Sequence, residues 1–283
     1  MDKLERVKVY ENTMDAIKKG GYTSPSGDEV EFTMVDQMVN GTKFYSTKVV
    51  NNYDELPKYD TEITVINNDT LYAAKELIDK GLKPAILNMA SFSTPGGGVT
   101  KGSAAQEESI FRRTNLSLSL YQFHSIGENY GIKQKEERYP LNYNFGGIYT
   151  PSVTVFKKSE KDDCELLDKP FFVDVISVSA IKNPPMHNGK VAPWACDVIL
   201  NKIRQILDIA IENKNDSLVL GAFGCGAYGT PPKEMAELFK KILSNYKYKT
   251  AFKAICFAII DDKNSYREHN PEGNLKPFKD VLL

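Results

Sequence analysis

The sequence has few of the residues that metal sites and disulfides require. Its 283 residues include four cysteines and three histidines, which lie far apart and form no CxxC or HxxxH pair. This spacing indicates neither a zinc site nor a disulfide framework. Neither sign of charge is in surplus, since the chain has 36 lysines and arginines and 37 aspartates and glutamates. A strongly basic segment that binds nucleic-acid backbones is therefore excluded, as is an acidic tail.

Long apolar runs are lacking too. No stretch approaches the roughly 20 apolar residues that span a bilayer. The first residues, MDKLERVKVYENTMDAIKKG, are charged throughout and lack the apolar segment of a secretory signal. We therefore expect an intracellular, cytoplasmic protein with no membrane partner. Hydrophobic residues still make up 41% of the chain, which is enough for a large buried core.

The order of the periodic patterns predicts an α/β protein. A helical pattern from Leu4 to Ile17 stops at Gly20, and the polar residues 21–57 are expected to wrap the core. EITVI, TLYAAKELIDKG and PAILNM then read as a strand, a helix and a strand, which the crossover rule places side by side and parallel. Residues 1–57 are thus predicted to be an N-terminal helical extension packed on one globular unit, residues 58–283.

The rest of the chain continues this alternation of strands and helices. Further strands are expected in IYTPSVTVFK, PFFVDVISVSA, SLVLGAF and FKAICFAII. Further helices are expected over about 106–121 and 195–213 and in PKEMAELFKKIL.

A glycine-rich turn follows the predicted strand SLVLGAF. Gly224 to Gly229 match G-x-G-x-x-G before a helix, as in dinucleotide-binding folds. Too little chain follows Asp261 for the further strands of such a fold, so that interpretation is disfavoured. Exposed N–H groups in this turn would suit a phosphate or diphosphate, although a tight turn without a ligand also explains the glycines.

A second glycine cluster, Gly96 to Gly98, precedes a pair of acidic residues at the start of a predicted helix. It is not a P-loop, because lysine precedes glycine in Lys101-Gly102-Ser103. Glu107 and Glu108 have an ordinary explanation, since acidic residues in the first turn complement the helix dipole. A carboxyl group at a short, fixed spacing from a glycine cradle could instead protonate the leaving oxygen of a sugar bound there.

These motifs together resemble the microbial-type poly(ADP-ribose) glycohydrolases, which are built on a macrodomain. The resemblance rests on GGG-x7-QEE and extends to NDTLYAA, LNMASFSTPGGG, QEESIFRRTNL and GAFGCGAYG. It implies a three-layer α/β/α macrodomain with a mixed central sheet. It also implies hydrolysis of ribose–ribose O-glycosidic bonds with release of ADP-ribose. We expect a monomer that uses no metal and no other cofactor.

The resemblance also implies roles for individual residues. Glu108 looks like the catalytic acid, Glu107 like the residue that holds the ribose beside the scissile bond, and Gln106 like the residue that orders the loop. The residues that would border the diphosphate and the distal ribose are Gly97 and Gly98, and Gly96 is expected to belong to the same ligand-binding turn. The turn that would close over the diphosphate comprises Gly224, Cys225, Gly226, Ala227, Tyr228 and Gly229. Tyr228 stands where microbial members usually carry a phenylalanine.

Two further polar residues follow or end predicted strands. Asp69 resembles the macrodomain acid that accepts a hydrogen bond from the adenine amino group, but it would also serve as the N-cap of the next helix. Asn88 is similar to an asparagine that contacts the distal ribose, but it could equally be a buried structural amide.

Two other functions stay open at this point. The same cleft could serve a non-catalytic ADP-ribose reader, although a reader needs neither Glu107 nor Glu108. The enzyme could also act on a single ADP-ribose rather than on a chain. The predicted partners are poly(ADP-ribose) or ADP-ribosylated macromolecules, and no sequence-specific nucleic-acid binding is expected.

Overall fold

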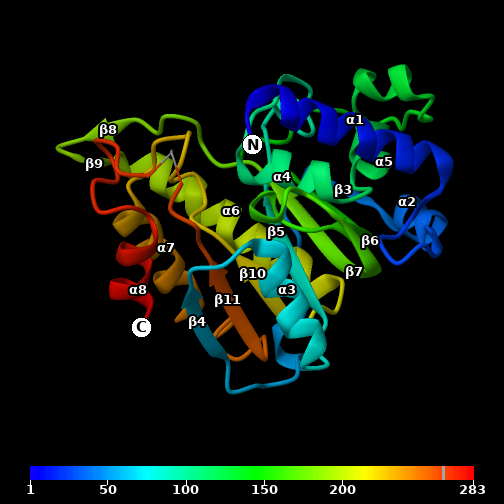
Figure 1. Ribbon diagram of the computed structural model, residues 1–283. Helices are drawn as coiled ribbons and strands as arrows, with labels where there is room; N and C mark the ends of the chain where they lie inside the picture. Colours follow the sequence, from blue (N-terminus) through cyan, green and yellow to red (C-terminus); the bar gives the residue numbers. More distant parts are fainter. Residues whose placement is uncertain (263–264) are drawn as a thin grey trace. The chain divides into compact units, whose positions relative to one another are not determined.

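The computed structural model describes residues 1–262 and 265–283 (Figure 1). Its helices are α1 Lys3–Lys19, α2 Val35–Gly41, α3 Thr70–Asp79, α4 Gln106–Arg113, α5 Ser117–Leu120, α6 Pro193–Glu212, α7 Pro232–Leu243 and α8 Leu275–Leu282. Its strands are β1 Gly21–Thr23, β2 Glu29–Glu31, β3 Lys43–Tyr45, β4 Glu62–Ile66, β5 Pro84–Met89, β6 Gly147–Lys157, β7 Leu166–Val178, β8 Met186–His187, β9 Lys190–Val191, β10 Ser217–Leu220 and β11 Ala254–Ala258. In the described residues no helix is both long and apolar enough to cross a membrane.

The chain forms two compact units, each assembled from three segments. Unit 1 comprises Met1–Phe44, Ala90–Pro140 and Ile148–Val175, and unit 2 comprises Tyr45–Met89, Leu141–Gly147 and Ile176–Leu283. The strands of the large sheet follow the order β3-β6-β7-β5-β10-β11-β4, and strand β7 runs from one unit into the other. The predicted domain boundary at residue 57 stays a prediction.

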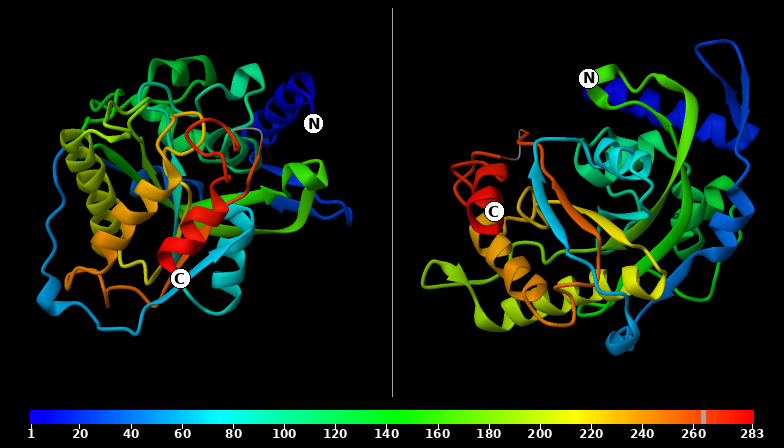
Figure 2. Two further views of the ribbon diagram at one scale, coloured as in Figure 1. Left: turned by 90° about the vertical axis from the view of Figure 1, so that its left-hand side faces the viewer. Right: turned by 90° about the horizontal axis from the view of Figure 1, so that it is seen from below.

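The central part of unit 2 is a parallel sheet covered by helices. Strand β10 pairs in parallel with β5 and with β11, and β11 pairs in parallel with β4. These strands are short and apolar, with Ile86, Leu218 and Phe257 completely buried, as expected for strands covered on both faces. The left view of Figure 2 shows α3 on one side of β4 and β11 and helices α6 and α7 on the other. The predicted three-layer α/β/α fold with a mixed sheet is confirmed.

The prediction that the strands on either side of α3 lie side by side is wrong. Both belong to the same sheet, but β10 and β11 lie between β5 and β4. The crossover rule fixes the hand of a βαβ connection and its parallel sense. It does not forbid later strands from taking the positions between them, and here two strands more than 120 residues further along the chain do so.

The predicted helix over 106–121 is also broken in the structure. Helix α4 ends because Thr114 takes an extended conformation and forms an antiparallel bridge with Val155 of β6. Asn115 fixes this change of direction, since its N–H donates to the Thr154 carbonyl and its Oδ1 accepts from the Thr154 N–H at 2.8 Å. The buried backbone groups of this segment thus form their hydrogen bonds with β6 instead of continuing the helix. Helix α5 begins at Ser117, two residues after Asn115.

Helix α1 is part of unit 1 and is capped at both ends. Asp2 and Glu5 form a capping box at its start, and Gly20 adopts the left-handed conformation at its end, as the glycine pair predicted. An aromatic cluster of Tyr22, Phe32 and Phe156 follows, with ring centroids 4.9 to 6.0 Å apart. The segment after α1 therefore contributes to the core of unit 1, and it includes helix α2, which the polar sequence did not predict.

Candidate active site

The glycine cluster of unit 1 forms a tight turn against helix α4. Gly96 and Gly97 have positive φ angles of 77° and 52°, which side chains rarely adopt. A Cβ atom on Gly97 would lie 2.6 Å from Oε1 of Glu108, and one on Gly96 would lie 2.7 Å from the Phe111 ring. Two glycines are therefore required here both by backbone conformation and by the close approach of α4.

The two carboxylates at the start of α4 hold this turn through its backbone. Glu107 accepts the N–H of Ser91 on Oε2 at 2.7 Å and the N–H of Gly96 on Oε1 at 3.0 Å. Glu108 accepts the N–H of Gly98 on Oε1 at 2.9 Å. The acidic pair is therefore tied to the backbone of this loop at three points.

The two carboxylates differ in what their second oxygen does. Both side chains are buried, with 4% of Glu107 and 7% of Glu108 exposed. Both oxygens of Glu107 accept hydrogen bonds from the loop, whereas Oε2 of Glu108 has no hydrogen-bond partner among the described residues. A buried carboxylate oxygen without a donor is costly unless a ligand or water supplies one. Gln106, the first residue of α4, is half-buried.

The remaining predicted residues belong to unit 2, where they lie at or after the carboxyl ends of parallel strands. Asp69 comes after β4, Asn88 is the penultimate residue of β5, and the turn from Gly224 comes after β10. The carboxyl ends of parallel strands meet at one edge of a sheet, and open α/β sheets bind ligands at that edge. The sheet therefore gathers these three elements.

Asp69 and Asn88 differ in how their side chains are satisfied. Asp69 caps α3, because its Oδ1 accepts the N–H groups of Leu71 at 3.0 Å and Tyr72 at 3.3 Å. Its predicted contact with adenine stays a prediction. The Asn88 amide is completely buried and donates to Oγ of Ser177 at 3.0 Å, while its Oδ1 has no hydrogen-bond partner among the described residues. Buried amide oxygens usually accept a hydrogen bond from the protein or from ordered water, so Oδ1 of Asn88 can accept one from a ligand or a water molecule.

The second glycine turn is closed by its own backbone and by Asn183. The Thr230 N–H donates to the Gly224 carbonyl at 3.0 Å, and the Asn183 N–H donates to the Tyr228 carbonyl at 2.8 Å. Gly224 and Gly229 have positive φ angles, and a Cβ atom on Gly224 would lie 2.9 Å from Cβ of Ala180. Within the turn, Ala227 is exposed while Gly226 and Tyr228 are half-buried. Cys225 is buried, and burial raises the pKa of its thiol.

Sequence reasoning missed the residues that support this turn from the C-terminal segment. The Cys225 carbonyl lies 2.8 Å from Nε2 of His269 and 3.4 Å from Nδ2 of Asn270. These residues lie more than 40 positions further along the chain and belong to no motif, so only the folded structure pairs them with the turn. The thiol itself has no reactive environment, since a buried cysteine with a raised pKa remains protonated.

These features define a macrodomain-type α/β protein with an acidic pair held by a glycine turn, a site that suits the hydrolysis of a sugar bond. The family model "Microbial-type PARG, catalytic domain" matches residues 10–158, where PARG stands for poly(ADP-ribose) glycohydrolase. The chain belongs to this family. The dinucleotide-binding interpretation is thereby wrong, and in the described residues only one strand, β11, follows the G-x-G-x-x-G turn.

Solved structures from two bacteria are similar to this chain. The poly(ADP-ribose) glycohydrolase from Thermomonospora curvata bound to the inhibitor ADP-HPD is 29% identical, with a TM-score of 0.77 over 97% of this chain and 98% of that one. The enzyme from Deinococcus radiodurans in complex with ADP-ribose is 26% identical, with a TM-score of 0.67 over 89% and 98%. No curated protein matches the chain in sequence.

Proposed function

We propose that Glu108 is the general acid and base with which this member of the family hydrolyses poly(ADP-ribose). The chain is a glycosidase of the poly(ADP-ribose) glycohydrolase type, as the family match and the similar structures indicate. What carries the assignment to Glu108 is the difference between the two carboxylates. Glu107 uses both oxygens to hold the loop, and Glu108 has one anchored oxygen and one without a partner.

The proposed reaction uses the two oxygens of Glu108 differently. Protonated Glu108 donates its proton from Oε2 to the ribose hydroxyl oxygen that leaves the anomeric carbon of the neighbouring ADP-ribose unit. The bond between that carbon and that oxygen breaks, and the sugar develops oxocarbenium character. The carboxylate then takes a proton from a water molecule, whose oxygen bonds to the anomeric carbon and completes hydrolysis. The Gly98 N–H keeps the carboxyl group oriented in both steps.

The other predicted residues are proposed to bind the ADP-ribose unit. In this proposal Gly97 and Gly98 border the diphosphate and the distal ribose, Gly96 completes the ligand-binding turn, and Glu107 holds the ribose next to the scissile bond. Asn88 meets the distal ribose with its unpartnered Oδ1, and Asp69 accepts from the adenine amino group. The turn from Gly224 to Gly229 offers uncharged N–H groups to the diphosphate, which fits a chain with no surplus of basic residues. The intracellular location and the monomeric state stay predictions.

The experiment compares the wild-type protein with Glu108→Gln on poly(ADP-ribose) without added metal. We expect the wild type to release monomeric ADP-ribose. General acid and base action contributes roughly 10²- to 10⁴-fold, so the variant should lose turnover by about that factor. Its affinity for ADP-ribose, measured by calorimetry, should change little because glutamine preserves the shape of the side chain.

Three outcomes would count against the proposal. Undiminished turnover by Glu108→Gln would remove the assignment of the catalytic acid. Faster release from mono-ADP-ribosylated protein than from chains would change the substrate class. Binding of ADP-ribose by the wild type without release of any product would indicate a reader.

A further inference from the structure

Helix α1 packs against the elements that carry the catalytic acid. In unit 1 it contacts α4 and the short 3-10 helix η2, Val99–Lys101, which continues the glycine turn. The approach is close, because a Cβ atom on Gly102 would lie 2.2 Å from the carbonyl oxygen of Lys3. A side chain at this position would push the first turn of α1 away. Helix α1 is therefore packed directly against the segment that follows the glycine turn.

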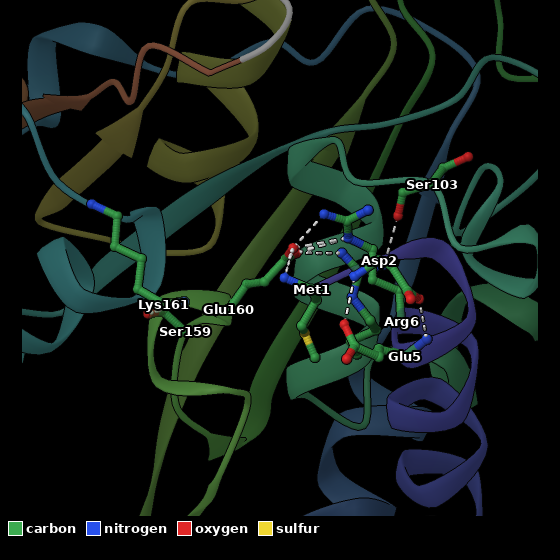
Figure 3. Close-up of polar contacts among 9 residues, drawn as sticks. Met1, Asp2, Glu5, Arg6, Ser103, Ser159, Glu160 and Lys161 are labelled. Atoms are coloured by element: carbon green, nitrogen blue, oxygen red, sulfur yellow. Dashed lines mark hydrogen bonds and ion pairs between the residues drawn. The ribbon is translucent and has the colours of Figure 1, made fainter.

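We propose that Glu160 is a positioning residue for the catalytic acid, acting through Arg112 and held in place by Arg6 of helix α1. The inference rests on the function proposed for Glu108. Glu160 begins a short 3-10 helix, η5 Glu160–Asp162, after strand β6. Figure 3 shows its carboxylate facing Arg6, with Ser103 of the turn nearby.

Arg112 connects this cluster to the turn. It lies four residues after Glu108 on α4, hence on the same helix face, and its side chain is completely buried. Its Nη1 donates to the carbonyl oxygen of Ser103 at 2.7 Å. Its Nη2 lies 3.6 Å from Oε2 of Glu160, and neither Nη2 nor Nε has a hydrogen-bond partner among the described residues. A buried guanidinium destabilises the fold unless a carboxylate balances it, and Glu160 supplies that charge.

The segment from Gly98 to Ser103 transmits the position of Arg112 to Glu108. Its two ends are joined, because the Gly98 carbonyl accepts from the N–H groups of Lys101 at 2.9 Å and Ser103 at 3.2 Å. At one end the Gly98 N–H holds Glu108, and at the other the Ser103 carbonyl is held by Arg112. The segment is therefore attached to α4 at two points one helical turn apart. A shift of Arg112 would move the donor that orients the catalytic carboxyl group.

Arg6 fixes the carboxylate of Glu160 on the opposite side. Its Nε donates to Oε1 at 2.9 Å and to Oε2 at 3.1 Å, and its Nη2 also donates to Oε1. Burial acts to raise the pKa of Glu160, but the hydrogen bonds and charge of Arg6, together with the charge of Arg112, outweigh it and lower the pKa. The carboxylate is thus ionised and oriented by α1 while it balances Arg112.

The test measures turnover and hydrogen exchange in Glu160→Gln. Glutamine keeps the shape but removes the charge, so Arg112 becomes an unbalanced buried cation and the Gly98–Ser103 segment should loosen. Displacing a catalytic group by about 1 Å can reduce the rate by roughly 10²-fold, and we expect kcat to fall by about 10- to 100-fold. KM should change by less than about threefold, because in the proposed mechanism Glu160 touches no substrate. Amide exchange in residues 96–103 should speed up.

Two further variants complete the experiment. Lys158→Gln breaks a more exposed ion pair of the same unit, Lys158 with Glu165 at 2.8 Å, and should leave kcat and exchange unchanged. Arg6→Gln, which keeps Arg112 and Glu160, should lower kcat in the same direction as Glu160→Gln, and Arg6→Lys should recover part of the loss.

The outcomes separate this inference from the function on which it rests. Wild-type kcat and wild-type exchange in both Glu160→Gln and Arg6→Gln would overturn it, as would a loss of thermal stability without a change in either measurement. If Glu108→Gln proved fully active, the proposed function would fail. Exchange in residues 96–103 would still show whether Glu160 holds the turn. If Glu160→Gln did not fold, Arg6→Gln would decide alone.

Discussion

Replacing Gly97 by alanine should show whether the close contact between the glycine turn and Glu108 matters for catalysis. Gly97 has a φ angle of 52°, and its added Cβ would lie 2.6 Å from Oε1 of Glu108. Ordinary van der Waals contact begins near 3.4 Å, so the oxygen must retreat by about 0.8 Å. That displacement weakens the 2.9 Å hydrogen bond from Gly98, and a shift of this size can reduce kcat by roughly 10²-fold.

A matched control removes the effect of the backbone conformation. Gly131 belongs to the same unit and has a φ angle of 69°, but an added Cβ meets nothing within 4 Å. Alanine in the left-handed region costs about 1 to 2 kcal/mol, partly offset by a less flexible unfolded chain. Both variants should therefore lose a few degrees of Tm.

Only Gly97→Ala should lose turnover. The assay is release of ADP-ribose from poly(ADP-ribose) at saturating substrate, alongside thermal unfolding. If Gly97→Ala kept kcat within about threefold of Gly131→Ala, the close contact with Glu108 would have no catalytic meaning and the reasoning would be refuted.

Three other substitutions test separate parts of the molecule. Asp69→Asn should leave Tm unchanged, since asparagine caps helices as well as aspartate does. It should weaken ADP-ribose binding, because an amide donor would face the adenine amino group. An unchanged affinity in calorimetry would mean that Asp69 is a helix cap alone. His269→Ala should raise the Kd for ADP-ribose about fivefold, because the Cys225 carbonyl then keeps only its longer contact with Asn270. His269→Gln is the control that keeps a donor, and equal affinity in the wild type and both variants would argue against support of the turn. Burial lowers the pKa of Lys202 to about 8 from 10.5, so the unfolded chain binds more protons between these values and stability should rise with pH there. Lys202→Met should reduce the dependence of the free energy of unfolding on pH, measured by denaturant unfolding. An unchanged pH dependence would contradict a lowered pKa of Lys202.

Much of the fold and the acidic pair could be predicted because each depends on local sequence. The strands EITVI and PAILNM have apolar patterns, Gly20 ends α1, and GGG-x7-QEE keeps the carboxylates close to the turn along the chain. The roles within the pair could not be predicted. Whether Glu107 or Glu108 keeps an oxygen free depends on which backbone N–H groups face each side chain.

What escaped prediction depends on contacts that are distant in sequence. The break after Arg113 comes from a bridge to Val155, and the support of the second turn comes from His269. The pairing of Arg112 with Glu160 joins residues almost 50 positions apart. Neither propensity nor periodicity contains these pairings, because they arise only when the sheet and its loops are assembled.

The position of β4 at one end of the sheet order has a consequence for synthesis of the chain. Its partner in the sheet is β11, which is Ala254–Ala258, so β4 must wait for nearly two hundred further residues before it can pair. Domains generally fold as units during synthesis, and unpaired strand edges are prone to aggregate. A ribosome that stops before residue 254 would release a chain whose β4 has no partner, however complete the catalytic turn and α4 already were.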